Sequence, residues 1–441
     1  MPTHSTDSDQ DVRRMRTVVW IITLATLGLV FDGYDLVVYG AVVSTFLRDP
    51  SQIGTVTPAI AGMLGSYMLF GVMVGALLAG TVGDILGRRK VILASYAWFS
   101  VGMALTAMSR DATTFGWLRF FTGLGVGSLV ATTAALVAEY APKGKKNMIN
   151  AITNGGIPLG SLLSALVAIL LMDKIGWRGM FWIGALPLVT LLPLAWFKMP
   201  ESIAWLAARG RLDEARALSE RTGVPMPELA SASTDQRQPD GHDRTGFAGL
   251  FSAHYLFPTL VLGLMSATGL VLVYSLNTWL PELMLRAGFN AKGSLSFLLV
   301  LNGGSLFGAL LASRFADRFG PKPVVAATFT IGAVALVLLT LGFPLAALLA
   351  SVAIVGLGTS GTQTLIYGFV ANYYRTNVRA AGVAWCAGFG RLGGIAGPML
   401  GSLLISTGMK LDAIFYVLAG IGLFGVLLTL LVPMSRSAAA R

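Results

Sequence analysis

The sequence has little of what soluble enzymes depend on. Only 12% of its 441 residues are charged, whereas about a quarter of an ordinary soluble protein is charged. The single cysteine, Cys386, excludes an internal disulfide. The three histidines lie outside the long apolar stretches, and the sequence shows no nucleophile–base pair, phosphate-binding loop or cluster of metal ligands. We therefore expect no enzyme, no metal and no other cofactor.

Long apolar stretches dominate the chain instead. Hydrophobic residues make up 55% of it, and its mean hydropathy is +0.72. A run of roughly 20 apolar residues can cross a hydrocarbon core about 30 Å thick, and such a span must be helical because no water satisfies its backbone. The alternating segments of a membrane β-barrel are absent. We predict an all-α protein embedded in the lipid bilayer, with twelve spans near 18–43, 57–82, 91–109, 113–138, 148–171, 178–197, 256–280, 293–315, 323–341, 345–371, 378–405 and 411–433.

Positive charges are distributed unequally between the connecting segments. If both termini are cytoplasmic, 23 of the 32 Lys and Arg lie on the cytoplasmic side, seven lie outside, and Arg119 and Arg391 lie within spans. This excess is typical of cytoplasmic loops. The net charge of +11 therefore indicates topology, and we expect no nucleic-acid partner. The N-terminal segment is polar up to about Arg16 and has no small-residue cleavage site, so we expect the first span to be retained.

The sequence repeats itself after the sixth span. Three matches occur in the same order: GDILGRRK (83–90) with ADRFGPKP (316–323), VAEY (137–140) with VANY (370–373), and LGSLL (159–163) with LGSLL (400–404). The first two share an offset of 233 residues. Such repetition indicates two duplicated six-helix halves, which is a transporter architecture.

The repeats divide the chain into five segments. We predict an N-terminal tail (1–17), a first half (18–197), a cytoplasmic loop (198–255), a second half (256–433) and a C-terminal tail (434–441). Within the loop, 202–222 has the pattern of an amphipathic helix, whereas the polar 227–246 is typical of a mobile linker.

Four motifs resemble the major facilitator superfamily. GTVGDILGRRK (80–90) is similar to the loop between its helices 2 and 3, RFFTGLGVG (119–127) to its helix 4, and PESIAWL (200–206) to the stretch after helix 6. FDGYDLVVYG (31–40) resembles helix 1 of the aromatic acid:proton symporters, and most closely their benzoate carriers. The resemblance implies the superfamily's fold and alternating access. It also implies import of a benzoate- or hydroxybenzoate-type carboxylate with protons across a bacterial inner membrane. We expect a monomer.

Two acids in the first span are the candidates for proton coupling. Asp32 and Asp35 lie on one face of a helix at i,i+3 spacing, and each costs at least a few kcal/mol to bury in a membrane. Arg119, in the fourth span, can serve as counter-ion to either acid. The alternative is a permanent ion pair that only holds the helices together.

Arg391 is the candidate anchor for a substrate carboxylate. It lies near the middle of its span, and spans seven to twelve contain no acid except Asp412 at the start of the last one, so the most available anion is the substrate. A guanidinium can bind a carboxylate through two parallel hydrogen bonds. The alternative is a pair with Asp32 across the halves. Aromatic and amide side chains are candidates for the slot that holds the ring, unless they only pack helices: Tyr34, Tyr39, Tyr67, Asn277, Trp279, Gln363, Trp385 and Phe389.

A third group of charges lies far from these sites. Glu139 follows Arg119 by 20 residues, or roughly 30 Å along a helix, so the two cannot share one site. We predict that Asp84, Arg88 and Glu139 form a gate latch at the cytoplasmic end, either switching or purely structural. Asp317 is the counterpart of Asp84 in the second half, where Asn372 replaces the acid and weakens any matching latch.

Two other functions compete with aromatic acid transport. A sugar:proton symporter would need several amides in the seventh span, but GLVLVYSLNTWLPEL (269–283) contains one asparagine and no glutamine. A non-transporting sensor or membrane enzyme would need a signalling domain or a catalytic cluster, and neither is visible. The sequence leaves the identity of the aromatic acid and the number of protons open.

Overall fold

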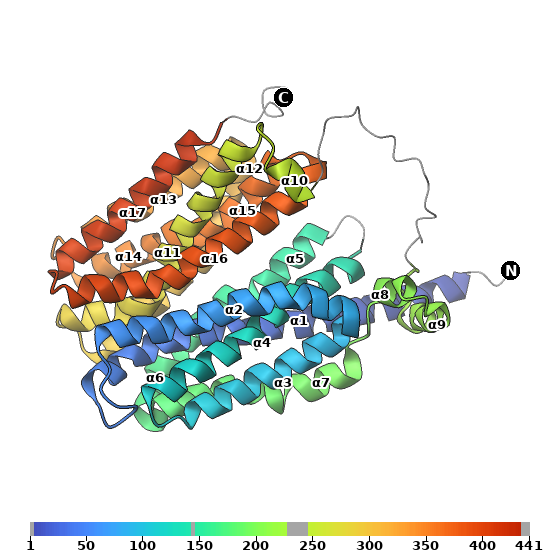
Figure 1. Cartoon of the computed structure of the whole chain (residues 1–441), viewed down its shortest axis with the longest axis horizontal. Coiled ribbons are helices and arrows are strands. Elements are labelled where there is room, and N and C mark those ends of the chain that lie inside the picture. Colours follow the sequence, from blue (N-terminus) through green and yellow to red (C-terminus); the bar gives the residue numbers. More distant parts are fainter. Residues whose placement is uncertain (1–3, 143–145, 227–245, 434–441) are drawn as a thin grey trace.

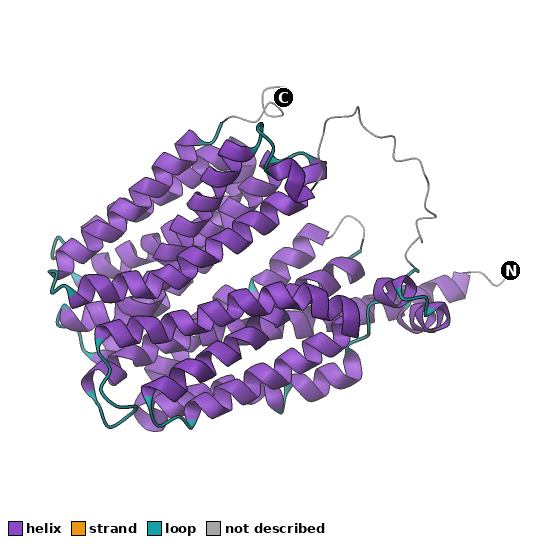
Figure 2. Cartoon of the chain, viewed as in Figure 1, coloured by secondary structure: helices purple, strands orange, loops and turns teal. Residues whose placement is uncertain are grey.

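A computed structural model describes residues 4–142, 146–226 and 246–433, and all regular structure in these ranges is helical (Figures 1 and 2). The first half contains α1 (His4–Arg48), α2 (Pro58–Leu86), α3 (Arg88–Ala107), α4 (Ala112–Tyr140), α5 (Lys146–Asn154), α6 (Gly156–Gly184), the 3₁₀ turn η1 (Leu186–Leu188) and α7 (Leu191–Lys198). The helices α8 (Ile203–Ala208), α9 (Leu212–Thr222) and α10 (Gly246–Leu250) belong to the connection. The second half contains α11 (Leu256–Arg286), α12 (Ala291–Phe319), α13 (Pro321–Leu338), α14 (Leu345–Gly356), the π-helix η2 (Leu357–Gly361), α15 (Thr362–Tyr373), α16 (Thr376–Ser406) and α17 (Leu411–Leu431).

All twelve predicted spans fall on helices. Ten helical stretches in the described ranges are long and apolar enough to cross a membrane. The 31-residue α16 carries the eleventh predicted span, and the short apolar stretch Leu186–Lys198 belongs to the sixth. Gly176, with a φ of +64°, interrupts the helical geometry of α6. This positive φ suits glycine, and it separates the fifth span from the sixth.

The structure reproduces the predicted duplication. α2 occupies residues 58–86 and α12 occupies 291–319, which is the 233-residue offset found in the sequence. Each helix ends at a glycine with positive φ, Gly87 at +94° and Gly320 at +87°. The single helix α4 corresponds at the same offset to α14, η2 and α15 together. The two halves are therefore copies of one helical plan, except that the second contains a π-helical turn.

The two halves meet at one end of the molecule and separate toward the other. We call the end that carries the start of α1, Gly87 and α8–α9 the terminal end, and the opposite end the far end. In Figure 1 the halves approach each other at the far end, on the left, and diverge toward α5 and α10. The backbone of α1 at Gly40 lies so close to Asn277 that a Cβ would be 1.9 Å from its carbonyl oxygen. Ser66 of α2 donates a hydrogen bond to the Ile395 carbonyl of α16 (2.7 Å).

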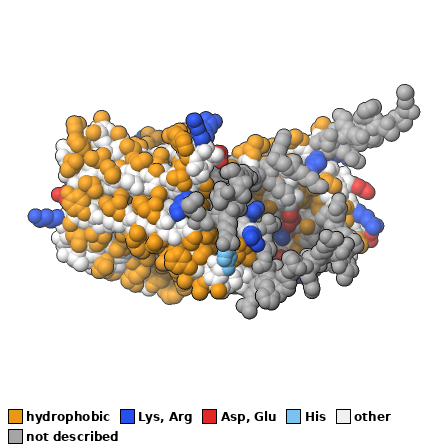
Figure 3. Space-filling view, turned by 90° about the horizontal axis from the view of Figure 1, so that it is seen from above, with side chains coloured by type: hydrophobic (Ala, Val, Ile, Leu, Met, Phe, Trp, Pro, Cys, Tyr) orange, Lys and Arg blue, Asp and Glu red, His pale blue; other side chains and the backbone are white. Residues whose placement is uncertain are grey.

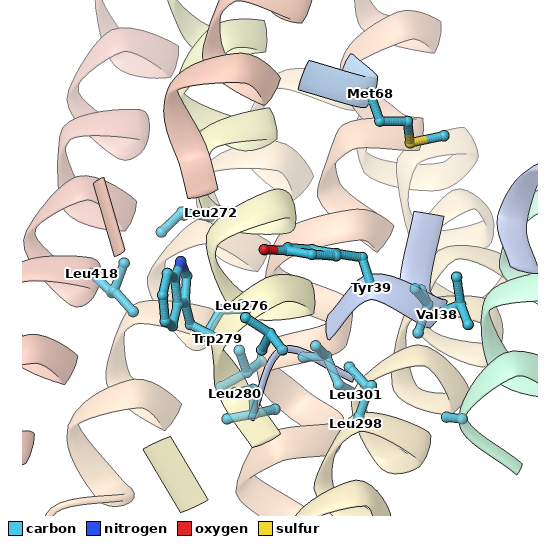
Figure 4. Close-up of a cluster of buried hydrophobic side chains, with 14 of the residues drawn as sticks. Val38, Tyr39, Met68, Leu272, Leu276, Trp279, Leu280, Leu298, Leu301 and Leu418 are labelled. Atoms are coloured by element: carbon cyan, nitrogen blue, oxygen red, sulfur yellow. The ribbon is translucent and has the colours of Figure 1, made fainter. Parts of the chain in front are cut away.

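Apolar side chains from both halves form the core near this contact. Val38 and Tyr39 of α1 lie beside Leu298 and Leu301 of α12 in one buried cluster (Figure 4). Hydrophobic side chains also cover much of the outer surface, and most Lys and Arg in this view lie away from the far end (Figure 3). An apolar exterior is what a lipid environment requires.

Two predictions about the polar segments need correction or limitation. The residues predicted as an N-terminal tail are helical from His4 onward, and α1 continues from them into the first predicted span without a break. The predicted amphipathic helix 202–222 is two helices, α8 and α9, divided at Gly210 (φ +73°). The predicted linker, apart from Gly246, and the C-terminal tail lie outside the described residues.

Candidate functional site

A fully buried ion pair joins α1 and α4. Arg119 is 1% exposed and Asp35 is 0% exposed, and one terminal nitrogen of the guanidinium contacts the carboxylate. The other terminal nitrogen donates to the Asp35 carbonyl at 3.4 Å. The rings of Phe181 and Tyr39 flank the guanidinium at 5.6 and 5.9 Å. Oδ2 of Asp35 and Nε of Arg119 are buried without a hydrogen-bond partner, so the pair leaves two polar atoms unsatisfied.

Glycines allow the helices of this pair to approach closely. A Cβ at Gly33, between the two aspartates, would lie 1.9 Å from the Ile157 carbonyl oxygen of α6. A Cβ at Gly123 would lie 2.2 Å from the Met68 carbonyl oxygen of α2. Small residues permit such contact between membrane helices. Gly123 therefore serves close packing of α4 on α2, and packing of α1 on α6 explains why glycine stands between the two acids.

Asp32 is buried beside this pair without an ion pair of its own. It is 4% exposed, and among the described residues no cation lies within salt-bridge distance of it. Arg391, on α16 of the other half, is near enough for its charge to act on both Asp32 and Tyr274. The arrangement brings an acid of one half and a cation of the other to the same region.

Arg391 is partly exposed and forms no hydrogen bond or ion pair with any described residue. The alternative of a direct Asp32–Arg391 pair is therefore wrong for this conformation. Two close contacts between the halves lie further along the same helices, at Ile395 one turn after Arg391 and at Gly40 about two turns after Asp32, and Asp32 and Arg391 themselves stay beyond ion-pair distance. A partly exposed guanidinium with free donors can accept an anion from solution.

Three of the predicted aromatic ring contacts are engaged in packing. The hydroxyl of Tyr34 donates to the Met180 carbonyl (2.9 Å), and that of Tyr39 donates to the Ala61 carbonyl (2.5 Å). Trp279 is 1% exposed, and its indole N–H donates to the Pro398 carbonyl at 2.9 Å. In this conformation all three side chains fill helix interfaces, which corrects their placement in a substrate slot.

The other candidate ring contacts are divided between packing and partial exposure. Trp385 and Phe389 stack at 5.1 Å and are partly exposed, although the indole of Trp385 also donates to the Thr259 carbonyl. Tyr67 is partly exposed and lies 5.7 Å from the ring of Trp117. These three side chains remain candidates for contact with an aromatic ligand.

The two amides occupy different positions. The side-chain oxygen of Asn277 accepts from Asn302 (3.0 Å) and its nitrogen donates to the Val273 carbonyl, so it connects helices. Gln363 donates to Ser266 at 3.0 Å, while its side-chain oxygen is buried without a partner. The free acceptor makes Gln363 the amide with unused hydrogen-bonding capacity.

At the terminal end the structure brings together two of the three predicted latch residues. Arg88 and Glu139 form an ion pair of 2.5 Å, and Ser202 donates a hydrogen bond to Glu139. Asp84 contributes its backbone carbonyl, which accepts from Trp205 (2.8 Å) and Arg209 (2.7 Å). Its carboxylate forms no ion pair with the described residues, so its predicted place in the latch is wrong for this conformation.

The matching position in the second half has no latch. Asp317 is exposed at the end of α12, and its carboxylate has no ion-pair partner within the described ranges. Asn372 donates to the Gly368 carbonyl of its own helix at 3.0 Å. The structure therefore gives Asp317 no gating contact.

Ion pairs at the far end were not predicted. Glu282 of α11 is 3% exposed and contacts Arg48 of α1 (3.5 Å) and Arg286 (2.9 Å), while Asp173 and Lys292 form a second bridge between the halves at 3.0 Å. Glu282 was missed because α11 continues past the predicted span 256–280 to include it. An acid placed directly after an apolar run was the available signal.

No group of three metal-ligating side chains occurs in the described part of the chain. The candidate site consists of the buried Asp35–Arg119 pair, the adjacent acid Asp32, the cation Arg391 on the opposite half and partly exposed aromatic rings. This arrangement can exchange a proton at Asp32 and hold an anion at Arg391.

Comparisons with known proteins identify relatives of the whole chain. The family described as "Sugar (and other) transporter" matches residues 20–296, and that described as "Major Facilitator Superfamily" matches residues 292–441. The chain is 35% identical to the benzoate transport protein of Acinetobacter baylyi, over 88% of the chain and 83% of that protein. It is 32% identical to the gentisate transporter of Corynebacterium glutamicum, with coverages of 90% and 84%. It is 31% identical to the gallate transporter of Pseudomonas putida, with coverages of 96% and 93%.

Solved structures share the fold. The crystal structure of a D-xylose-proton symporter superposes with a TM-score of 0.73 at 17% sequence identity, over 95% of this chain and 98% of the other. A partially occluded, inward-open form of the xylose transporter XylE from E. coli gives 0.74 at 19% identity, with coverages of 94% and 98%. At these identities the likeness concerns the fold alone.

Proposed function

The chain belongs to the major facilitator superfamily, and we propose that it imports a small aromatic carboxylate by proton symport with alternating access. The family resemblance stated for FDGYDLVVYG agrees with relatives that are named transporters of benzoate, gentisate and gallate. The observation that carries the proposal is the buried Asp35–Arg119 pair with Asp32 beside it and an unpaired Arg391 facing it from the second half.

Asp32 is the proposed proton carrier. A carboxylate without a salt bridge in a low-dielectric site is costly when charged, so protonation lowers that cost. Asp35 has the Arg119 guanidinium to compensate its charge. The two acids therefore have different tasks: Asp35 and Arg119 maintain a fixed charged framework, and Asp32 takes and releases the proton.

Arg391 is the proposed anchor for the substrate carboxylate. Its guanidinium is partly exposed and has no hydrogen-bond or ion-pair partner among the described residues, and Phe389 and Trp385 lie two and six residues before it on the same helix. An anion bound there neutralises the cation, and Asp32 must then be protonated to avoid a second negative charge nearby. This exchange couples the two cargoes.

We propose that the terminal end faces the cytoplasm of a bacterial inner membrane. The support is the excess of Lys and Arg in the segments of that end. With this orientation the ion pairs Arg48–Glu282 and Asp173–Lys292 hold the two halves together on the outer side of the membrane. The halves are separated on the cytoplasmic side. The Arg88–Glu139 pair stands at the inner gate, and we propose that the carrier works as a monomer.

A transport assay in proteoliposomes tests the proposal. The purified chain is reconstituted, a pH gradient (outside acidic) is imposed, and uptake of radiolabelled benzoate, 4-hydroxybenzoate, gentisate and gallate is measured beside D-xylose and benzamide. We expect accumulation of at least one acid, its collapse when a protonophore removes the gradient, and no uptake of xylose or benzamide. Equal uptake with and without the gradient contradicts symport, and xylose uptake contradicts the substrate class.

A further inference from the structure

A cavity at the terminal end lies apart from the site between the halves. Its volume is about 610 Å³, and it is bordered by the start of α3, the end of α7 and the helices α8 and α9. Five basic side chains and two acidic ones line it. A cavity of this size can hold a small polar group, and the excess of cations selects for an anion.

Both acidic side chains of the cavity already have partners. Arg211 donates two hydrogen bonds to Glu214 (2.7 and 2.6 Å) and thereby lowers the pKa of that carboxyl. Glu201 accepts from the backbone N–H groups of Arg89 and Ser202, both at 2.9 Å. These contacts satisfy the negative charges within the protein and leave the other cations uncompensated.

Three basic side chains have unused donors or charge. Lys90 and Arg221 are exposed and form no ion pair with the described residues. The Nε of Arg89 is buried without a hydrogen-bond partner, although its terminal nitrogen donates to the Trp196 carbonyl (2.5 Å). Converging ammonium and guanidinium groups are the donors that phosphate oxygens require.

The cavity opens beside a surface suited to acyl chains. Trp196 and Phe197, at the end of an apolar helix, are 59% and 81% exposed, and both line it. The adjacent Lys198 ammonium lies 5.7 Å from the ring of Trp20. Aromatic rings next to basic side chains are typical of the membrane–water interface, so the cavity lies at the level of lipid headgroups.

We propose that this cavity binds the phosphate of an anionic phospholipid of the phosphatidylglycerol type, with Arg89, Lys90 and Arg221 as donors. The acyl chains then lie against Trp196 and Phe197. A free phosphate ion matches the cations but leaves the two aromatic side chains without a partner, which is why the lipid is the occupant. The lipid stabilises the packing of α8 and α9 on the bundle.

Lipid-dependent thermal stability of the full-length carrier tests this site. The purified chain in detergent is titrated with phosphatidylglycerol or phosphatidylcholine in mixed micelles, and the unfolding midpoint is recorded. The charge-removal variant is Lys90→Gln/Arg221→Gln, and the charge-retaining variant is Lys90→Arg/Arg221→Lys. The matched control is Arg314→Gln/Arg318→Gln, which removes two cations near the end of α12, outside the cavity.

We expect phosphatidylglycerol to stabilise the unaltered chain more than phosphatidylcholine does. The charge-removal variant should need about thirtyfold more phosphatidylglycerol, because each of the two cations contributes about 1 kcal/mol to binding an anionic lipid surface. The charge-retaining and control variants should behave like the unaltered chain. If the double variant does not fold, Lys90→Gln and Arg221→Gln alone should each show a part of the loss.

Three results would overturn the proposal. One is the absence of any preference for phosphatidylglycerol over phosphatidylcholine. Another is an equal loss in the control variant, which would show a general effect of net charge. The last is an equal stabilisation by inorganic phosphate or glycerol 3-phosphate at comparable concentrations, which would assign the cavity to a soluble phosphate. None of these measurements depends on transport.

Discussion

The two halves share one helical plan but differ in where they carry charge. At the 233-residue offset, Arg119 of α4 corresponds to Val352 of α14, and Glu139 corresponds to Asn372. The first half thus contains a buried ion pair and a terminal-end latch, and the second half contains neither at the matching positions. Its own mid-helix charge is Arg391, which has no intramolecular partner in the described ranges.

This difference indicates a division of labour. A buried charge needs compensation, and the first half supplies it internally through Asp35 and Arg119. The second half leaves Arg391 uncompensated, so the missing anion must come from outside that half: from substrate, or from Asp32 when the halves approach. We infer that the first half handles the proton and the second half binds the carboxylate.

The largest effect should come from removing the unpaired acid of the first half. Asp32→Asn cannot be deprotonated, so accumulation driven by a pH gradient should be abolished, whereas exchange of substrate across the membrane without net proton movement should continue. Asp35→Asn should retain part of the gradient-driven uptake. Full accumulation by Asp32→Asn in proteoliposomes would remove it as proton carrier and with it the proposed division.

The buried pair should show strong coupling when it is removed in two steps. Arg119→Gln leaves Asp35 as an uncompensated buried charge, which typically costs about 3–5 kcal/mol. The double variant Asp35→Asn/Arg119→Gln removes that charge, so it should unfold at a higher temperature than Arg119→Gln alone. Thermal unfolding in detergent measures both. Additive losses of stability would show that the pair is not coupled. A double variant that regains stability but not transport would assign the pair to the coupling mechanism rather than to packing.

The mid-helix cation of the second half should control recognition of the acid. A charge-assisted hydrogen bond contributes about 1.5–3 kcal/mol, so Arg391→Ala should weaken substrate binding about tenfold or more. Arg391→Lys should rescue binding only in part, because lysine lacks the planar fork of donors. The test is competition binding, which compares the affinities for benzoate and benzamide. Loss of the anchor should also remove the preference for the acid over its amide. If Arg391→Ala still rejects the amide, the anchor is elsewhere, and Arg119 is the next candidate.

The sequence predicts the membrane-spanning helices of this protein better than the contacts of individual side chains. The spans could be predicted because long apolar runs admit only helices in a membrane. Pairing of Arg119 with one of the two acids could be predicted because few other charges lie within the first-half spans, but the choice of Asp35 over Asp32 could not. Packing of Tyr34 and Tyr39 could not be predicted, because it depends on how α1 is rotated against α6 and α2. The unpaired Arg391 depends on how far the halves are separated, and Glu282 lies just beyond its apolar run. Sequence composition determines which helices exist, but not how they rotate or tilt.

The smallest effect should arise at the terminal-end latch, where the halves can be compared at matching positions. The side chains of Arg88 and Glu139 are 24% and 21% exposed, so solvent screens the pair, and its contribution is about 0.5–1 kcal/mol. Glu139→Gln should therefore lower the transport rate roughly two- to fivefold without changing substrate affinity, because the pair joins α3 to α4 within the first half and its loss loosens that end of the half as it moves.

The reciprocal change in the second half supplies the control. Asn372→Glu restores the acid at the matching position, but Pro321 stands where Arg88 stands in the first half, so the new carboxylate gains no partner and transport should stay unchanged. Within the first half, Arg88→Glu should restore a defective Glu139→Arg carrier by reversing the pair. Ser202→Ala separates the two contacts of Glu139, since it removes the hydrogen bond and keeps the ion pair. A normal transport rate in Glu139→Gln would show that the charge difference between the halves at this end has no part in transport. A change of transport rate in Asn372→Glu as large as that in Glu139→Gln would show the same.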